Sequence, residues 1–127
     1  MTELKSIIEI IGVRDSGNFD QERLLLKAKQ NIDIGNFLVL TGMLADDKSV
    51  IPDRNDVYWF PDTTVAEGEF IRLYSKSGTN GKVAGKYGNN PATYHNFYWD
   101  KTSPVWTEKH NAAILLTLQE WVMHKNV

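Results

Sequence analysis

The stretch RLLLKAKQ, residues 23–30, decides the fold class because its apolar residues recur at every second position. Three apolar side chains would share one side of an extended chain: Leu24, Leu26 and Ala28. Three cations would share the opposite side: Arg23, Lys27 and Lys29. Leu25 alone departs from this alternation. A period of two is typical of a β-strand that buries one face and leaves the other in water, so the stretch predicts such a strand.

Short β-prone segments occur along the rest of the chain, separated by turn-forming clusters. In FIRLYS, residues 70–75, Ile71 and Leu73 would share one face. Further segments of this kind are IIEIIGV (7–13), FLVLTG (37–42), VYWF (57–60) and TYHNFYW (93–99). We expect loops at residues 45–56 and 75–92, and a turn with positive φ at Gly68. About seven to nine short strands without an internal repeat predict one all-β domain over residues 1–127, a sandwich or a barrel.

The C-terminal segment NAAILLTLQEWVMH, residues 111–124, fits two structures. Apolar residues recur at helical spacing: Ile114, Leu115, Leu118, Trp121 and Val122. A hairpin is the other interpretation, but LTLQEW, residues 116–121, contains no Gly, Asn or Pro to form its turn. A sandwich with a C-terminal helix at about 111–124 is therefore the alternative architecture.

Composition limits the classes of function without choosing one. The 127 residues are 42% hydrophobic and 24% charged, with a net charge of −2 and no cysteine. The absence of cysteine excludes disulfides, thiolate metal sites and a cysteine nucleophile. The charge gives no overall attraction to nucleic acid or to an anionic membrane. Glu9 interrupts the N-terminal apolar stretch and Glu3 precedes it, so we expect no signal peptide, no membrane segment and a cytoplasmic protein.

The order of these features resembles the lamin-tail domain family. IIGVRDSGNFDQERLLLKAKQ (10–30) looks like the first two strands of that family, and IGNFLVLTG (34–42) is similar to its Gly-Asn-aromatic loop and following strand. YWFPDTTVAEGEFIRLYS (58–75) resembles its aromatic-Pro segment, Gly turn and next strand. VWTEKHNAAILL (105–116) looks like its late Trp and Asn/Leu-rich strand, and WVMHKN (121–126) like its closing strand. The resemblance covers about residues 7–125.

This resemblance implies an immunoglobulin-like β-sandwich that acts as a non-enzymatic binding module. It makes Trp106 a core residue at the entrance to a late strand, with Ile114 and Leu116 facing inward. The other face of that strand would carry Ala113, Leu115 and Thr117. Phe37 departs from the family pattern, because a tryptophan is usual there. No apolar heptads of a lamin rod are present.

Motifs for catalysis, metal binding or cofactor binding are not found. No serine lies in Gly-x-Ser-x-Gly, and the glycine-rich segment lacks the spacing of a P-loop. The histidines have no metal-binding pattern: His95, His110 and His124. The acidic loop around Asp46 and Asp47 lacks an EF-hand pattern, so we expect its aspartates to cap and form turns. We predict no catalytic residue, no metal and no cofactor.

A basic, glycine-rich stretch at residues 76–95 is the first candidate binding site. It contains no acid and combines lysines with aromatic rings and a histidine: Lys76, Lys82, Lys86, Tyr87, Tyr94 and His95. A flexible loop of this composition can neutralise phosphates and stack on bases. Three lysines are few for a strong nucleic-acid binder, so a weak contact with nucleic acid or another polyanion is the alternative function. A solvated loop without a ligand is the simpler interpretation.

The aromatic residues suggest a protein-binding surface. Neighbouring residues of a strand face opposite ways, so Tyr58 and Phe60 oppose Trp59, and Tyr98 opposes Trp99. Some of this aromatic area should reach the surface, and Trp99 is the candidate anchor. We predict a non-catalytic module that binds a protein partner through exposed aromatics or sheet edges. Open edges also allow a homo-oligomer, and an enzyme with a spatially assembled site is a remote alternative.

Overall fold

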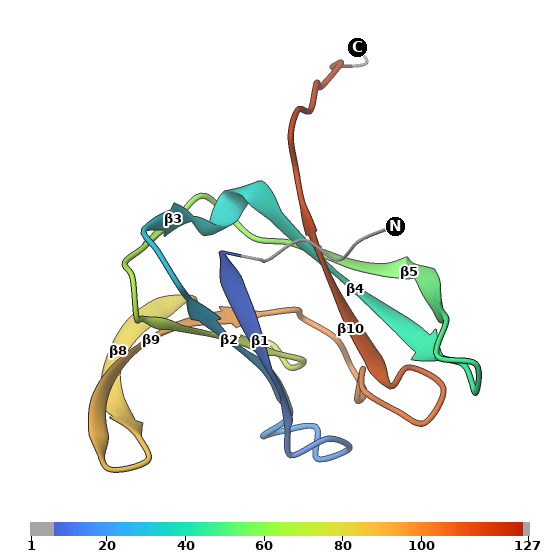
Figure 1. Cartoon of the computed structure of the whole chain (residues 1–127), viewed down its shortest axis with the longest axis horizontal. Helices are drawn as coiled ribbons and strands as arrows, with labels where there is room; N and C mark the ends of the chain where they lie inside the picture. The colour runs from blue at the N-terminus through green and yellow to red at the C-terminus, as the bar shows by residue number, and fades with distance from the viewer. Residues whose placement is uncertain (1–6, 126–127) are drawn as a thin grey trace.

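The computed structural model describes residues 7–125, apart from the side chains of residues 53–55, and is an all-β structure (Figure 1). A short 3-10 turn, η1, spans Ile34–Asn36. The strands are β1 (Ile8–Arg14), β2 (Arg23–Ala28), β3 (Ile32–Asp33), β4 (Phe37–Leu44), β5 (Val50–Trp59), β6 (Thr64–Val65), β7 (Phe70–Tyr74), β8 (Gly81–Tyr87), β9 (Asn90–Tyr98) and β10 (Ala112–Thr117). The predicted all-β class is confirmed, although the ten strands within residues 7–125 exceed the expected number because β3 and β6 have only two residues each.

Two sheets form a β-sandwich. The larger sheet has the strand order β1-β2-β7-β9-β8, and its pairs are antiparallel except for the parallel pair β7–β9. The smaller sheet has the order β10-β4-β5 and is antiparallel throughout. β3 and β6 form a separate, antiparallel two-stranded sheet. Four strand edges of the two larger sheets are therefore open: those of β1, β8, β10 and β5.

The core lies between the inner faces of the two sheets. The larger sheet contributes alternate residues of its central strands: Leu24, Leu26, Ala28, Ile71, Leu73 and Phe97. The smaller sheet and its flanks contribute Phe37, Val39 and Phe60, with Tyr58, Ala113 and Leu115 packed against them. The alternation of RLLLKA is thus confirmed, and Leu25 is buried on the opposite face against Phe70 and Tyr94. Gly68 adopts the predicted positive φ, at +86°.

Two expected loops contain strands. Residues 75–92 were expected to be a loop, but β8 and β9 form a hairpin whose two-residue turn holds Gly88 at φ +62°. All seven residues of β8 are exposed, so the strand has no apolar side that a periodicity could reveal. Residues 45–56 include most of β5, whose pairing with β4 shifts register between Leu40 and Thr41. That shift breaks the simple alternation on which the prediction relied.

The C-terminal segment forms a strand, so the alternative of a helix at 111–124 is wrong. β10 pairs with β4, and the residues that follow it to residue 125 form neither a helix nor the expected closing strand. The predicted orientation of β10 is also wrong. Ala113 and Leu115 pack on the core, because they lie opposite Thr41 and Val39, which face inward on β4. Leu116 is exposed on the outer face.

A buried carboxylate joins three loops at one end of the sandwich. Glu22 is fully buried, and its Oε1 accepts a hydrogen bond of 2.9 Å from the Gly17 amide. Its Oε2 accepts from the Ser75 hydroxyl and, at 2.9 Å, from the Val105 amide. Trp106, the next residue, is buried in the core as predicted. Glu22 therefore holds the chain before β2, the end of β7 and the segment that leads to β10.

Candidate interaction surfaces

The outer face of the smaller sheet carries two rows of apolar side chains, which we name the apolar face. Residues that pair directly across a sheet project to the same side. The pairing of β10, β4 and β5 therefore places Leu116, Leu38 and Trp59 in one row and Ile114, Leu40 and Val57 in the next. Val57, Trp59 and Leu116 are each more than 40% exposed. Among the described residues, the larger sheet covers the inner face of this sheet, whereas much of the apolar outer face is accessible.

Trp59 is held in a fixed position on the apolar face. Its indole Nε1 donates a 2.7 Å hydrogen bond to the carbonyl of Gly35. Its ring also packs edge-to-face against Trp121, with 5.1 Å between ring centroids and an interplanar angle of 82°. The ring is nonetheless 44% exposed. A large, oriented and accessible ring of this kind is typical of the anchors of protein interfaces.

The tail, residues 118–125, follows β10 and leaves the body of the sandwich. The Leu118 amide donates a 2.7 Å hydrogen bond to the Asn36 carbonyl, which is the last backbone bond recorded along the described chain. Beyond it the chain continues in the general direction of β10 and projects away from both sheets (Figure 1). Its apolar residues are exposed, Val122 at 89% and Met123 at 78%. Chain that exposes this much apolar surface is stabilised when something covers it.

The outer face of the larger sheet combines rings with cations. The Arg72 guanidinium lies 3.9 Å from the ring centroid of Tyr94, and its Nε donates a 2.8 Å hydrogen bond to Asn96. Tyr74 stacks on Tyr98 with 5.3 Å between centroids. These side chains already contact one another, so their rings and donors are largely used within the sheet.

Of the three predicted lysines, Lys82 and Lys86 lie on the exposed strand β8, and Lys76 lies on the segment before it. Their ammonium groups do not gather into one site. Lys76 Nζ lies 5.4 Å from the ring centroid of Tyr74. Lys82 Nζ lies 3.7 Å from a carboxylate oxygen of Glu69, which reduces the charge it can offer a ligand. Lys86 is exposed further along β8. Strand structure also removes the flexibility that the predicted loop would have had.

The predicted aromatic and histidine site residues divide between surface and interior. Tyr87 is exposed on one side and stacks on Phe70, with 4.7 Å between ring centroids. Tyr94 is buried, and its hydroxyl donates a 2.6 Å hydrogen bond to the Lys86 carbonyl. His95 is 4% exposed. Trp99 is 8% exposed in the core beside Trp106, so the prediction of Trp99 as a surface anchor is wrong.

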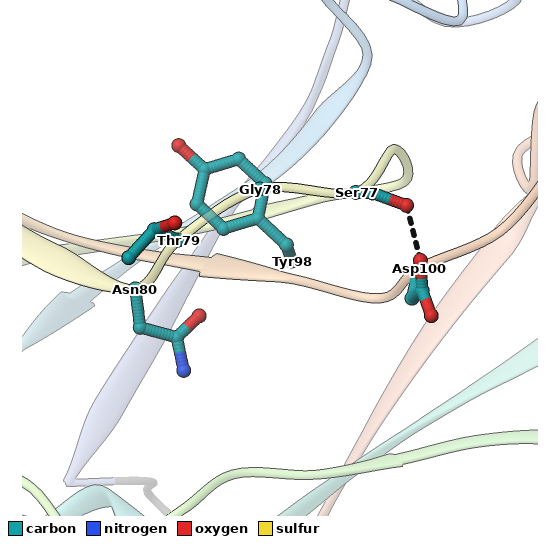
Figure 2. A pocket seen from close by; sticks show the side chains of 6 residues that line it. All are labelled: Ser77, Gly78, Thr79, Asn80, Tyr98 and Asp100. Carbon is teal, nitrogen blue, oxygen red and sulfur yellow. Dashed lines mark hydrogen bonds between the residues drawn. The ribbon is translucent and has the colours of Figure 1, made fainter.

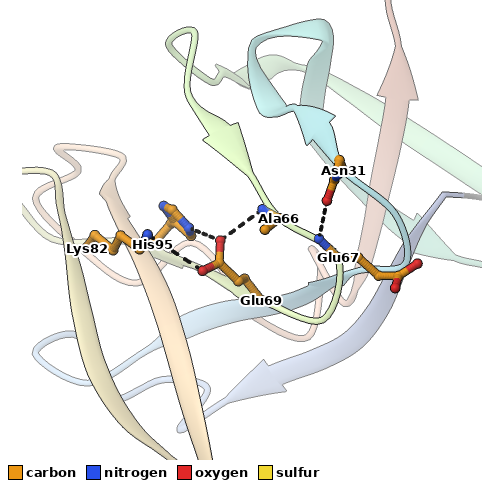
Figure 3. Close-up of polar contacts among 6 residues, drawn as sticks. All are labelled: Asn31, Ala66, Glu67, Glu69, Lys82 and His95. Atoms are coloured by element: carbon orange, nitrogen blue, oxygen red, sulfur yellow. Dashed lines mark hydrogen bonds and ion pairs between the residues drawn. The ribbon is translucent and has the colours of Figure 1, made fainter.

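His95 belongs to a polar cluster at the start of β7 (Figure 3). Glu69 Oε1 accepts a 2.8 Å hydrogen bond from the Ala66 amide and lies 2.9 Å from His95 Nε2. The hydrogen bond with His95 is the largest cause that lowers the pKa of Glu69, and the bond with Ala66 is the next. Asn31 accepts a further bond from the backbone of Glu67. The cluster closes the turn between β6 and β7, and its carboxylate is already occupied by these partners.

A shallow polar hollow lies where the chain leaves β7 and β9 (Figure 2). It is lined by Ser77, Gly78, Thr79, Asn80, Tyr98 and Asp100. The Ser77 hydroxyl donates to the carboxylate of Asp100, which has a positive φ of +61°. Gly78 is required because a Cβ there would lie 2.3 Å from the Tyr98 ring. No histidine or lysine lines the hollow to activate the serine, so the arrangement closes a turn and does not resemble a nucleophile with its base.

The acidic loop forms turns as predicted at Asp47. Its carboxylate accepts from the backbone amide and the hydroxyl of Ser49, and these bonds lower the pKa of Asp47. Asp56 lies further along and pairs with Lys101. Among the described residues, no group of three or more His, Cys, Asp or Glu side chains is placed to hold a metal ion.

Comparisons of the chain with protein-family models, with curated proteins and with solved structures found no match. Within residues 7–125, no helix has the length and apolar character to cross a membrane. The surfaces themselves are therefore the basis on which a function can be proposed.

The apolar face was missed by sequence reasoning, although a signal for it was present. FLVL (37–40) and AILL (113–116) are continuous apolar runs and do not alternate with polar residues. Continuous runs of this kind are typical of strands that are covered on both faces. Among the described residues, the larger sheet covers the inner face of β4 and β10, whereas side chains on their outer face are exposed or half-buried. The unbroken runs are therefore a sequence signal for these apolar side chains of the outer face.

Proposed function

We propose that this chain is a non-catalytic interaction module that binds a protein partner through the apolar face. The observation that carries the proposal is that β4, β5 and β10 place Leu116, Leu38 and Trp59 side by side on the outer face, where Leu116 and Trp59 are more than 40% exposed even though Trp121 packs against Trp59. Soluble monomers rarely leave a contiguous apolar patch of several side chains exposed unless it is an interaction site. The cover that the apolar runs require is a partner.

Trp59 is the anchor of this proposed site. Its hydrogen bond to Gly35 fixes the ring before a partner arrives, so little side-chain entropy is lost when the ring is buried. The neighbouring Leu38 and Leu116 would exclude water around it, as the surroundings of interface hot spots do. The resemblance to lamin-tail domains supports the same class of function, since it implies a binding module on an immunoglobulin-like sandwich.

The test is the capture of partners from an extract of the native source by three forms of the full chain. Val57→Lys places a charge on the apolar face, whereas Val83→Lys makes the same change at a residue of nearly equal exposure, 43% against 40%, on the larger sheet. We expect wild type and Val83→Lys to capture the same partner and Val57→Lys to lose it.

Two results would contradict the proposal. One is equal capture by Val57→Lys and Val83→Lys, which would place the partner elsewhere. The other is partner binding whose affinity falls steeply as the salt concentration rises. Burial of apolar surface depends little on ionic strength, whereas contact with a polyanion through Lys76 and Lys86 would depend on it strongly. That second result would favour the alternative of nucleic-acid or polyanion binding.

A further inference from the structure

The edge of β10 differs from the other open edges of the two larger sheets. Natural sheets protect their edges with charges, proline or bulges, because unpaired backbone groups otherwise recruit another strand. Three of the four edges have such protection: β1 has Glu9 and a register shift after Ile10, β8 has Lys82 and Lys86, and β5 has Pro52 and its own register shift. β10 has an uninterrupted register with β4 and no charged residue or proline. It is an edge on which a strand can add.

Within the described residues the tail pairs with no strand, although the Trp121 ring packs against Trp59 of the same copy. Its exposed residues Trp121, Val122 and Met123 are apolar or aromatic, and it carries one acid, Glu120. The sequence disfavours a return to the edge of its own β10, because residues 116–121 contain no Gly, Asn or Pro for a tight turn. Instead the tail continues away from the sandwich (Figure 1). The β10 edge that it can reach is that of another copy.

The lengths of the two segments match. β10 has six residues, which span about 20 Å at the rise of an extended strand, and the tail has a comparable length. Leu118 lies between them, so a two-fold axis near Leu118 would place each tail antiparallel to β10 of the other copy. Such an isologous arrangement closes on itself and leaves neither edge open. With Glu120 as the single charge between Ala112 and Met123, no pair of like charges is brought together at the axis.

We propose that two copies of this chain exchange their tails, each tail adding as a fourth strand to the smaller sheet of the other copy. The backbone of β10 gains the hydrogen bonds that its edge lacks, and the exposed apolar residues of the tail gain a cover. This inference goes beyond the proposed function, because it uses the edge of the smaller sheet and leaves Val57, on the opposite strand of that sheet, accessible to a different partner.

The test is sedimentation velocity of the full chain over a range of about 1 to 100 µM, where a specific dimer with a micromolar Kd is resolved. Two variants break different halves of the exchange. Val122→Pro removes a backbone donor from the tail at a residue that is 89% exposed, so the sandwich itself should keep its melting temperature. Leu116→Glu places a negative charge on the receiving strand opposite Glu120 of the added tail, and Val83→Glu is its control on the larger sheet, with 41% and 40% exposure respectively.

We expect a dimer for wild type, Val83→Glu and Val57→Lys, and a Kd at least about tenfold higher for Val122→Pro and for Leu116→Glu. A monomeric wild type at about 100 µM, or Kd values of Val122→Pro and Leu116→Glu equal to that of wild type, would overturn the exchange. Loss of partner capture by Val57→Lys alone concerns the apolar face, so the two proposals can fail separately.

Discussion

Replacing Glu22 by Gln should destabilise the protein although the side chain keeps its size and shape. The Glu22 carboxylate is an acceptor at both oxygens: Oε1 faces the Gly17 amide, and Oε2 faces the Val105 amide and the Ser75 hydroxyl. A glutamine amide has only one acceptor oxygen. Whichever way it is oriented, its NH2 group points at a backbone N–H that had an acceptor before.

The size of the effect follows from these bonds. If the amide nitrogen takes the place of Oε1, the Gly17 N–H is left without its acceptor, which costs about 1–3 kcal/mol. The bonds retained at the other oxygen change from charge-assisted to neutral, a further loss of about 1 kcal/mol each. We therefore expect a decrease of roughly 3–5 kcal/mol in the free energy of unfolding. Glu22→Ala, which removes every bond and leaves a cavity, should be worse still.

Urea denaturation followed by tryptophan fluorescence measures the loss, and Ser75→Ala is the matched comparison. That variant removes one donor to Glu22 and leaves the carboxylate with three backbone amides, those of Gly17, Val105 and Trp106, so it should cost about 1 kcal/mol. The reasoning would be refuted if Glu22→Gln unfolded within about 0.5 kcal/mol of wild type, the range of an ordinary surface substitution.

Two further predictions concern the core and the polar cluster. Trp106→Ala should cost about 3–5 kcal/mol in thermal or urea denaturation, because Trp106 is buried, whereas Trp106→Phe should cost less, since it keeps a ring and removes an indole N–H that has no protein partner. An unchanged melting temperature for Trp106→Ala would contradict its core position. The lowered pKa of Glu69 means that its contribution to stability is complete above its ordinary value of 4.5 and is lost as pH falls through the lower folded value. Glu69→Gln should therefore reduce the loss of stability measured between neutral pH and acid, and identical pH profiles would exclude this role.

The parts of the fold that could be predicted from the sequence are those whose buried apolar residues alternate with charged ones. β2 and β7 belong to this group, because Leu24 and Leu26 lie between the half-buried Arg23 and Lys27, and Ile71 and Leu73 lie on either side of the half-buried Arg72. β8 could not be predicted, since both of its faces are exposed and its strand structure comes from pairing with β9. Such a strand is determined by its neighbour and by the turn at Gly88, and local side-chain pattern has little influence on it.

The inward face of β10 could not be predicted for the opposite reason. AAILLT is apolar at nearly every position, so either alternate set is suited to a core, and the pairing with β4 selects Ala113 and Leu115. A shift of one residue would exchange the two sets. The same property made Trp99 difficult to place, because a run of aromatic residues from Phe97 onward does not say which of them the second sheet covers.

This ambiguity of β10 is itself informative about function. Selection for a core alone requires apolar residues at Ala113 and Leu115 and permits polar residues at Ile114 and Leu116, as β2 shows with its cations. Apolar residues on both faces of β10, on an edge without charges and before an apolar tail, are needed only if both the outer face and the edge are covered. The proposed protein partner would supply the first cover, and the proposed tail exchange would supply the second. A chain in which Leu116→Glu changed neither partner capture nor association would leave both apolar features of β10 without a cause.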